Sequence, residues 1–137
     1  MSWYTEIEET VFSYVVYKLN KKGINVFCTT EISKTSVDSS GNPTMFPTIY
    51  LHELQQVEVG QDLTNKSVNA VLSTIEVQVF TKSKDDNKKY SGEVAEIMKA
   101  LNYNATGLPI VTNTGEYYLG AARYRRVIGS ADRNIVN

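Results

Sequence analysis

Two stretches of the chain repeat apolar residues every three or four positions, as one face of an α-helix does. The first begins with a Thr-x-x-Glu helix-start pattern at residues 5–8, and its apolar positions are Ile7, Val11, Tyr14, Val15 and Leu19. The second lies within residues 82–103, and its apolar positions are Tyr90, Val94, Ile97, Met98 and Leu101. The pattern therefore predicts two helices, and Gly23 is the expected end of the first.

Five other segments are typical of β-strands, because they alternate apolar and polar residues or are rich in β-branched and aromatic ones. They are residues 24–29, 46–55, 71–80, 108–112 and 117–128. The third is the clearest. One of its faces carries Val71, Ile75, Val77 and Val79, and the opposite face carries Thr74, Glu76 and Gln78. Residues 36–44 and 56–69 between these segments are predicted as an exposed loop and a polar connection.

The order of these elements is αβββαββ, and it predicts an α+β fold. One apolar stripe on each helix and one apolar face on each strand are buried together if both helices pack on one face of a mostly antiparallel five-stranded sheet. We expect a single domain over residues 1–128, followed by a C-terminal tail over residues 129–137. The other sheet face is left uncovered although it includes Tyr50, Leu54 and Phe80, so we expect a partner to bury part of it.

Composition and charge narrow the classes of function. The 137 residues include 42% hydrophobic and 21% charged residues, and the formal net charge is −1. Dedicated nucleic-acid-binding domains usually carry a basic excess, although residues 117–131 contain three arginines and no acidic residue. The chain shows no signal-peptide pattern and no apolar stretch near the roughly 20 residues of a membrane span. We therefore expect assembly in the cytoplasm, without a membrane.

Residues with catalytic potential are few. His52 stands beside Glu53, but neighbours in a strand point to opposite faces, so the two are not expected to touch. The lone Cys28 is interpreted as a small buried hydrophobe. One cysteine and one histidine cannot form a Cys/His metal cluster, and the glycines form no phosphate-binding loop. We expect no enzyme activity, no cofactor and no metal.

The arginine-rich strand is the strongest candidate for a binding surface. Alternation places Arg123 and Arg125 on one face of the strand and Arg126 on the other. Together with Tyr118 and Tyr124 these residues fit three interpretations, namely phosphate binding, a solvated or salt-bridged sheet edge, and a protein interface. The small residues at positions 120–122 favour close packing of another segment.

Several segments together resemble the tail-terminator or tail-completion proteins of tailed bacteriophages and prophages. They read FPTIYLHELQ (46–55), GQDLTNKSVN (60–69), VLSTIEVQVFTKS (71–83), AEIMKALNY (95–103) and ARYRRVI (122–128). The resemblance covers roughly residues 5–128. It implies a virion protein without enzyme activity that assembles in the bacterial cytoplasm into a ring, typically a hexamer. Such a ring caps the tail tube, stops tube growth and provides the surface to which the head attaches, while DNA only passes through its channel.

By analogy with that family, the 56–69 connection is expected to contact the tube or a neighbouring subunit through Gln61, Asp62, Asn65 and Lys66. The strand with Arg123, Arg125 and Arg126 is expected at a subunit boundary, facing carboxylates of the neighbour. Two alternatives stay open. One is a head-completion or connector adaptor protein of the head–tail joint. The other is a small nucleic-acid-binding module that uses Tyr118, Tyr124 and the arginines to stack on bases and bind phosphates.

Overall fold

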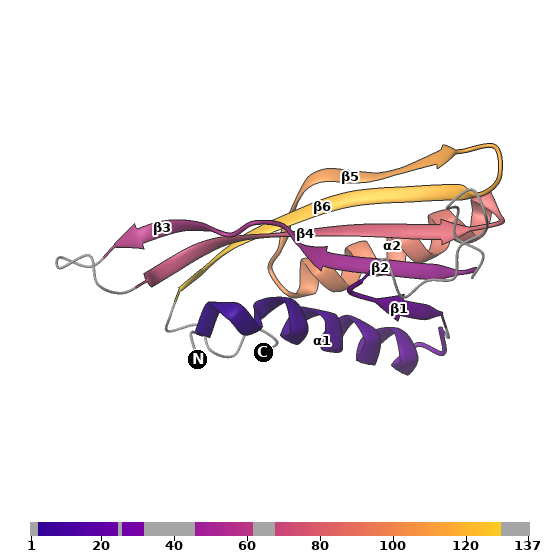
Figure 1. Cartoon of the computed structure of the whole chain (residues 1–137). Coiled ribbons are helices and arrows are strands. Elements are labelled where there is room, and N and C mark those ends of the chain that lie inside the picture. The colour runs from indigo at the N-terminus through magenta and orange to yellow at the C-terminus, as the bar shows by residue number, and fades with distance from the viewer. Residues whose placement is uncertain (1–2, 25, 32–45, 62–67, 130–137) are drawn as a thin grey trace.

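The computed structural model describes residues 3–24, 26–31, 46–61 and 68–129. Its elements, in chain order, are η1 (Trp3–Glu6), α1 (Ile7–Lys21), β1 (Phe27–Thr29), β2 (Thr48–Glu53), β3 (Val57–Gln61), β4 (Val68–Thr81), α2 (Lys84–Ala100), β5 (Asn104–Asn113) and β6 (Tyr118–Gly129) (Figure 1). The loop predicted at residues 36–44 lies outside the described residues, as do Asp62, Asn65 and Lys66 and all of the predicted tail except Gly129.

The strands form one sheet in the order β1-β2-β4-β6-β5, with β3 also paired to β4. Among the described strands, only the β1–β2 pair is parallel, and the other pairs are antiparallel. The predicted α+β class, with two helices and a mostly antiparallel sheet, is confirmed. The sheet has six strands rather than five, because part of the 56–69 segment, predicted as a polar connection, pairs with β4 as β3.

The N-terminal end of the long strand β4, together with β3, extends beyond the rest of the sheet and the helices. Its first residues, from Val68 to Leu72, pair with β3, whereas its later residues, from Ile75 to Phe80, pair with β2. In Figure 1 the β3–β4 hairpin extends beyond the start of α1, at the side of the molecule away from the β5–β6 turn. We call β3 and residues 68–72 of β4 the arm.

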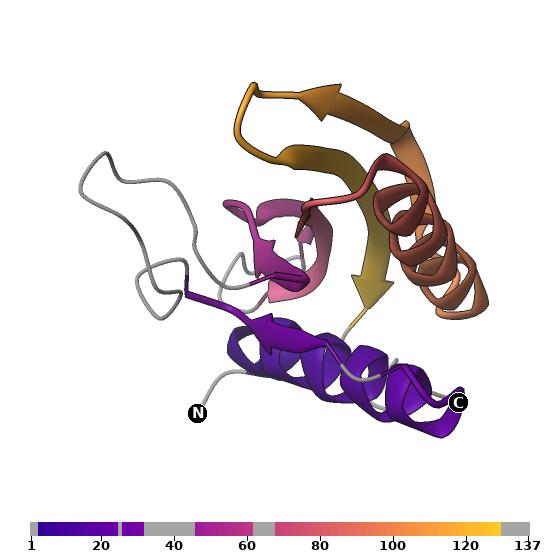
Figure 2. The same ribbon diagram turned by 90° about the vertical axis from the view of Figure 1, so that its right-hand side faces the viewer.

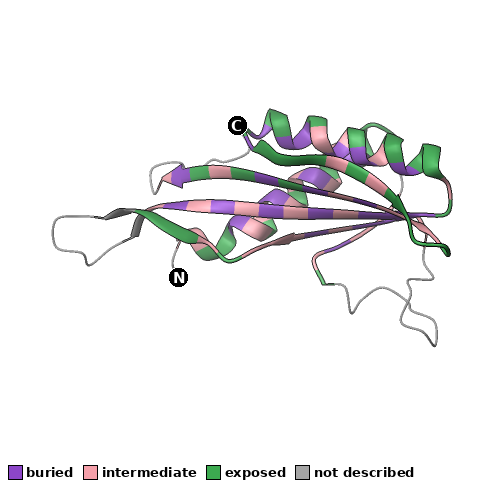
Figure 3. Ribbon diagram, turned by 90° about the horizontal axis from the view of Figure 1, so that it is seen from above, coloured by how far each residue is buried: buried purple, intermediate pink, exposed green. Residues whose placement is uncertain are grey.

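One hydrophobic core lies between the sheet and the two helices, which Figure 2 shows on the same side of the curved sheet. Along β4 the positions that face the helices are at most 3% exposed, and they are Val71, Ser73, Ile75, Val77 and Val79. Figure 3 shows how these buried residues alternate with half-buried ones along the strand. From α1, the core receives Ile7, Val11, Val15 and Leu19, which are four of the five residues of the predicted stripe.

The helix ends follow local rules in part. The N-cap of α2 is Ser83, whose hydroxyl accepts a hydrogen bond from the Asp86 amide at 3.3 Å. After α1 the chain turns at Gly23 with φ +78°, a conformation that favours glycine. The predicted cap at Thr5 is wrong. The N-cap of α1 is Glu6, which makes no side-chain cap hydrogen bond, because η1 occupies the first turn.

Gly120 of β6 allows α2 to pack directly on the sheet. A Cβ atom at this position would lie 2.2 Å from Asn87 Oδ1 and 2.5 Å from Ser91 Oγ. The same Asn87 side chain donates hydrogen bonds to the main-chain oxygens of Val79 (2.9 Å) and Tyr118 (3.0 Å). The close packing predicted for residues 120–122 is therefore present, and the segment that approaches is the chain's own α2.

Candidate functional site

The arginine-rich strand β6 divides its predicted binding residues between two faces, as alternation indicates. Arg123 lies opposite Glu76 and Arg125 opposite Thr74, on the face without helices, which we call the open face. Arg126 lies opposite the buried Ser73, on the helix-covered face. The three arginines therefore cannot converge on one ligand.

Three of the five predicted residues of β6 serve the protein's own packing. Tyr124 is 2% exposed within the core, and burial raises its pKa to about 12. Arg126 is half-buried and donates a hydrogen bond from Nη1 to the Leu101 carbonyl oxygen at 2.9 Å. Tyr118 is half-buried beside Thr81. Of the five predicted residues, only Arg123 and Arg125 have exposed side chains, and both lie on the open face.

On the open face a row of polar side chains crosses three strands. Glu76 of β4 accepts a 2.9 Å hydrogen bond from Arg123 Nε of β6, and its other oxygen lies 3.3 Å from His52 Nε2 of β2. Tyr50 stacks on the His52 ring with 4.4 Å between centroids. The row satisfies Glu76 from both neighbouring strands, which favours this strand register.

The expectation that the arginines face carboxylates of a neighbouring subunit stays a prediction, but Arg123 already has a carboxylate partner. Its carboxylate is Glu76 of the same chain. Sequence reasoning missed the pair because the two residues stand 47 positions apart and meet only through the β4–β6 register. Arg125, by contrast, makes no hydrogen bond or ion pair with any of the described residues.

His52 and Glu53 lie on opposite faces of β2, as predicted. Glu53 belongs to a polar cluster on the helix-covered face, where Ser73 Oγ donates to its Oε2 at 2.5 Å and Gln56 Nε2 donates to its Oε1 at 2.9 Å. Burial raises the pKa of Glu53, and the hydrogen bonds from Ser73 and Gln56 lower it in part. Within the cluster, Ser73 Oγ also lies 2.9 Å from Tyr103 Oη. These contacts join β2, β4 and the short connection between α2 and β5.

Cys28 of β1 packs against the hydrophobic core. Burial raises the pKa of its thiol to about 11. At neutral pH the group is therefore protonated, and a protonated thiol is a poor nucleophile. This environment agrees with the interpretation of Cys28 as a small buried hydrophobe.

Exposed aliphatic side chains form two patches that sequence reasoning did not identify. The arm patch consists of Val57 (54% exposed), Val59 (49%) and Val127 (57%), and Val57 and Val127 both lie opposite Leu72 of β4. The edge patch consists of two exposed residues of the edge strand β5: Leu108 (73%), which lines a hollow beside α2, and Ile110 (70%), which lies opposite Ala121. Only β6 pairs with β5 among the described strands, so the outer edge of β5 is a free sheet edge. The sequence did not indicate that Val57 and Val59 are exposed, because they stand in a segment predicted as a polar connection and their exposure depends on how β3 pairs in the sheet.

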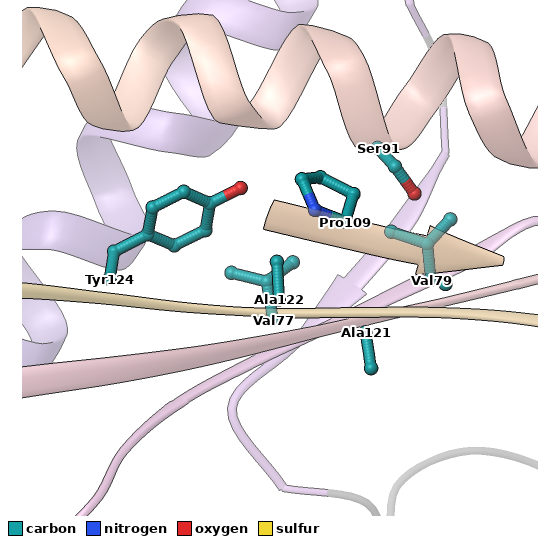
Figure 4. Close-up of a pocket in the computed structure, with 8 residues that line it drawn as sticks. Val77, Val79, Ser91, Pro109, Ala121, Ala122 and Tyr124 are labelled. Atoms are coloured by element: carbon teal, nitrogen blue, oxygen red, sulfur yellow. The ribbon is translucent and has the colours of Figure 1, made fainter. Parts of the chain in front are cut away.

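A groove runs between α2 and β5, on the helix-covered side of the sheet. One hollow of about 360 Å³ is lined by residues that include Ala95, Tyr103 and Leu108, and another of about 370 Å³ by residues that include Lys84, Lys88 and Pro109. Figure 4 shows the packed region between them, where Pro109 lies between Ser91 and Tyr124 while Ala121 points to the opposite face.

The described residues contain neither a metal-binding cluster nor a membrane-spanning helix. In it, no three His, Cys, Asp or Glu side chains gather closely enough to hold a metal ion. None of the helices in the described ranges combines the length and the apolarity of a membrane-spanning segment.

Of the four residues predicted to contact the tube or a neighbour, Gln61 ends β3 at the tip of the arm, and the other three lie outside the described residues.

No protein-family model matches the sequence, and no curated protein matches it either.

Proposed function

We propose that this chain is a structural virion protein, a tail terminator of a tailed bacteriophage. In this proposal it forms a ring, typically a hexamer, on the last ring of tail-tube protein, stops further tube growth and provides the surface for head attachment. Its partners are further copies of itself, the tail-tube protein and the head–tail connector proteins. Its place is the head-proximal end of the tail, after assembly in the bacterial cytoplasm, and DNA only passes through the ring.

The observation that carries this proposal is the pair of apolar patches on opposite edges of one sheet. Valine, leucine and isoleucine side chains that are at least 49% exposed lie on β3, β5 and the end of β6, and clustered exposed apolar residues mark protein–protein contact sites. A subunit with two different contact patches associates head to tail, which closes into a ring when the rotation between copies allows it. The sequence resemblance to tail-terminator proteins is the reason for proposing that this ring caps a tail tube.

The open face gives less support to the nucleic-acid-binding alternative. Glu76 pairs with Arg123, so Arg125 is the one exposed arginine of β6 left without a carboxylate among the described residues. Tyr124 lies buried and has no face on which a base can stack. Non-specific nucleic-acid binding depends on several phosphate contacts, and these five residues offer few of them.

Mass measurement and electron microscopy of the purified chain, alone and with polymerising tail-tube protein, test the proposal. We expect rings, either in solution or at one end of each tube, and tubes that stop elongating once the protein is added. The variant Leu108→Ser with Ile110→Ser removes the edge patch at exposed positions without touching the core. It is expected to abolish both ring formation and the arrest of tube growth, so it is compared with the unchanged protein.

Three other outcomes contradict the proposal, and each indicates a different role. A chain that stays monomeric and leaves tube growth unchanged rules out the terminator. Rings that bind the connector but never bind tubes assign the protein to the adjacent head-completion position. Salt-dependent DNA binding by a monomer assigns it to the nucleic-acid-binding class.

A further inference from the structure

The groove between α2 and β5 has walls of different chemistry. On the β5 side, Pro109 and Leu108 present apolar atoms. On the α2 side, Lys84 and Lys88 line one hollow, whereas Lys99 and the acidic Glu96 line the other. An occupant of the first hollow that fits both of its walls needs an apolar side chain on one side and a carboxylate on the other.

Within the described residues, the side chains of Lys84 and Lys88 make no ion pair and no hydrogen bond. Like charges four positions apart on a helix repel each other by a few tenths of a kcal/mol. A carboxylate from outside the chain, placed between them, would remove this repulsion and gain two attractive contacts.

The arm carries an apolar side chain next to a carboxylate, which is the combination that the first hollow of the groove requires. In β3, Val57 is followed by Glu58, whose side chain is exposed and makes no ion pair or hydrogen bond with the described residues. Neighbouring residues of a strand point to opposite faces, so a β3 strand that enters a groove by its free edge presents valine to one wall and glutamate to the other. Five strand residues span about 17 Å, and the eleven-residue step along α2 from Lys88 to Lys99 also spans about 17 Å.

The arm cannot reach the groove of its own chain. β3 pairs with one side of β4, whereas β5 lies two strands away on the other side, beyond β6. Figure 1 shows β3 extending away from the body, and the labelled β5 strand lies along the opposite edge of the sheet. The arm and the groove can therefore meet only between different copies, in a contact that uses a different surface on each partner.

We infer that the arm of one copy docks in the α2–β5 groove of a second copy, with Val57 against the β5 wall and Glu58 between Lys84 and Lys88. This inference rests on the ring assembly proposed above and names the two surfaces that form each subunit contact. The occupant is a second copy because the charge and the length of the arm match the groove, and because both surfaces repeat on every subunit.

Charge reversal and its repair test this contact. We expect Glu58→Lys to weaken self-association at least about tenfold, which corresponds to about 1.4 kcal/mol, and Lys84→Glu with Lys88→Glu to do the same. A protein with all three substitutions is expected to recover most of the association. The matched control is Glu9→Lys, an equal change of charge at an exposed position of α1, which should leave association unchanged. Analytical ultracentrifugation gives the association constants, and circular dichroism confirms that each variant is folded.

The outcomes separate this inference from the proposed function. If rings form and cap tubes while Glu58→Lys and the lysine variant associate like the unchanged protein, the docking mode is wrong and the terminator proposal stands. If each variant weakens association but the combined variant does not recover, the charges do not meet, and the docking mode is again wrong. A chain that neither associates nor caps tubes contradicts both.

A cysteine pair gives an independent readout of the same contact. We expect a mixture of Val57→Cys protein and Val111→Cys protein to form a disulfide-linked heterodimer under mild oxidation, because Val111 lines the β5 wall of the hollow that also contains Lys84 and Lys88. Each variant alone serves as the control, since head-to-tail docking never brings two copies of one position together. Equal cross-linking in the mixture and in the single variants contradicts the inference.

Discussion

The two faces of the sheet achieve stability in different ways. On the helix-covered face, Ile75 of β4 is fully buried, and α2 approaches so closely that Gly120 leaves no room for a Cβ atom. On the open face, Glu76 is the next residue along the same strand, and cross-strand polar contacts with Arg123 and His52 hold it. The packing of one face therefore depends on shape and that of the other on charge, so the two faces should respond to different substitutions and different solvents.

Shape dependence is greatest at Gly120. We expect Gly120→Ala to lower the free energy of unfolding by about 3 kcal/mol, because the added methyl group overlaps Asn87 and Ser91 and either moves α2 or breaks the Asn87 hydrogen bonds. Chemical denaturation measures the change. The matched control is Gly92→Ala on α2, where nothing lies within 4 Å of the added atom. It is expected to stabilise the protein by about 0.5–1 kcal/mol, since alanine favours helices. Similar values for the two variants would contradict close packing at Gly120.

Charge dependence is tested by comparing two arginines of the same strand and face. We expect a double-mutant cycle of Arg123→Ala with Glu76→Ala to give a coupling of about 0.5 kcal/mol, which is reasonable for a pair whose arginine is well exposed. Screening by 1 M salt should reduce it. The same cycle with Arg125→Ala is the control and should give a coupling near zero, because Arg125 lies opposite Thr74. Equal couplings would show that general charge, rather than the Arg123–Glu76 contact, stabilises the open face.

The smallest effect appears at alkaline pH and concerns the covered face. Burial raises the pKa of Tyr103 and of Tyr124 from 10 to about 12. Between these values the folded protein keeps both phenol protons while the unfolded chain loses them, so stability falls as pH rises from 10 to 12. Spectrophotometric titration of the folded protein should show two tyrosines that ionise at a higher pH than an ordinary tyrosine. On unfolding, their pKa should return to the ordinary value.

The variant Tyr124→Phe tests the assignment. It should remove one late-ionising tyrosine and make the alkaline loss of stability less steep, with little change at neutral pH. Tyr50 on the open face is not a neutral comparison, because burial and the nearby Glu76 and Glu8 carboxylates also raise its pKa. A titration in which both late steps persist in Tyr124→Phe would assign them to other residues.

The sequence predicted most of the secondary structure but placed one segment wrongly. The helix around Val94 and the strand around Ile75 were predicted correctly, because a sustained apolar period reports which side faces a core. β3 was missed because Val57 and Val59 are exposed, so the segment lacks a buried face, and it is a strand only through pairing with β4.

The candidate site was predicted in part. Alternation correctly divided Arg123 and Arg125 from Arg126. It could not show that Tyr124 lies in the core or that Arg126 donates to the Leu101 carbonyl oxygen, because the strand has two faces and the pattern alone did not identify which one the helices cover. The groove beside Pro109 was not foreseeable, since it exists only where α2 and β5 lie side by side.

Local signals in the sequence were enough to predict the two amphipathic helices, the alternating strands and the α+β class. The contacts between distant segments came only from the folded chain, such as Glu76 with Arg123, Asn87 over Gly120 and β3 along β4. The two kinds of information differ in their range along the chain. A period of two or 3.6 residues is fixed by neighbours along the chain, whereas strand register and helix position depend on contacts between segments tens of residues apart, which no single stretch of sequence contains.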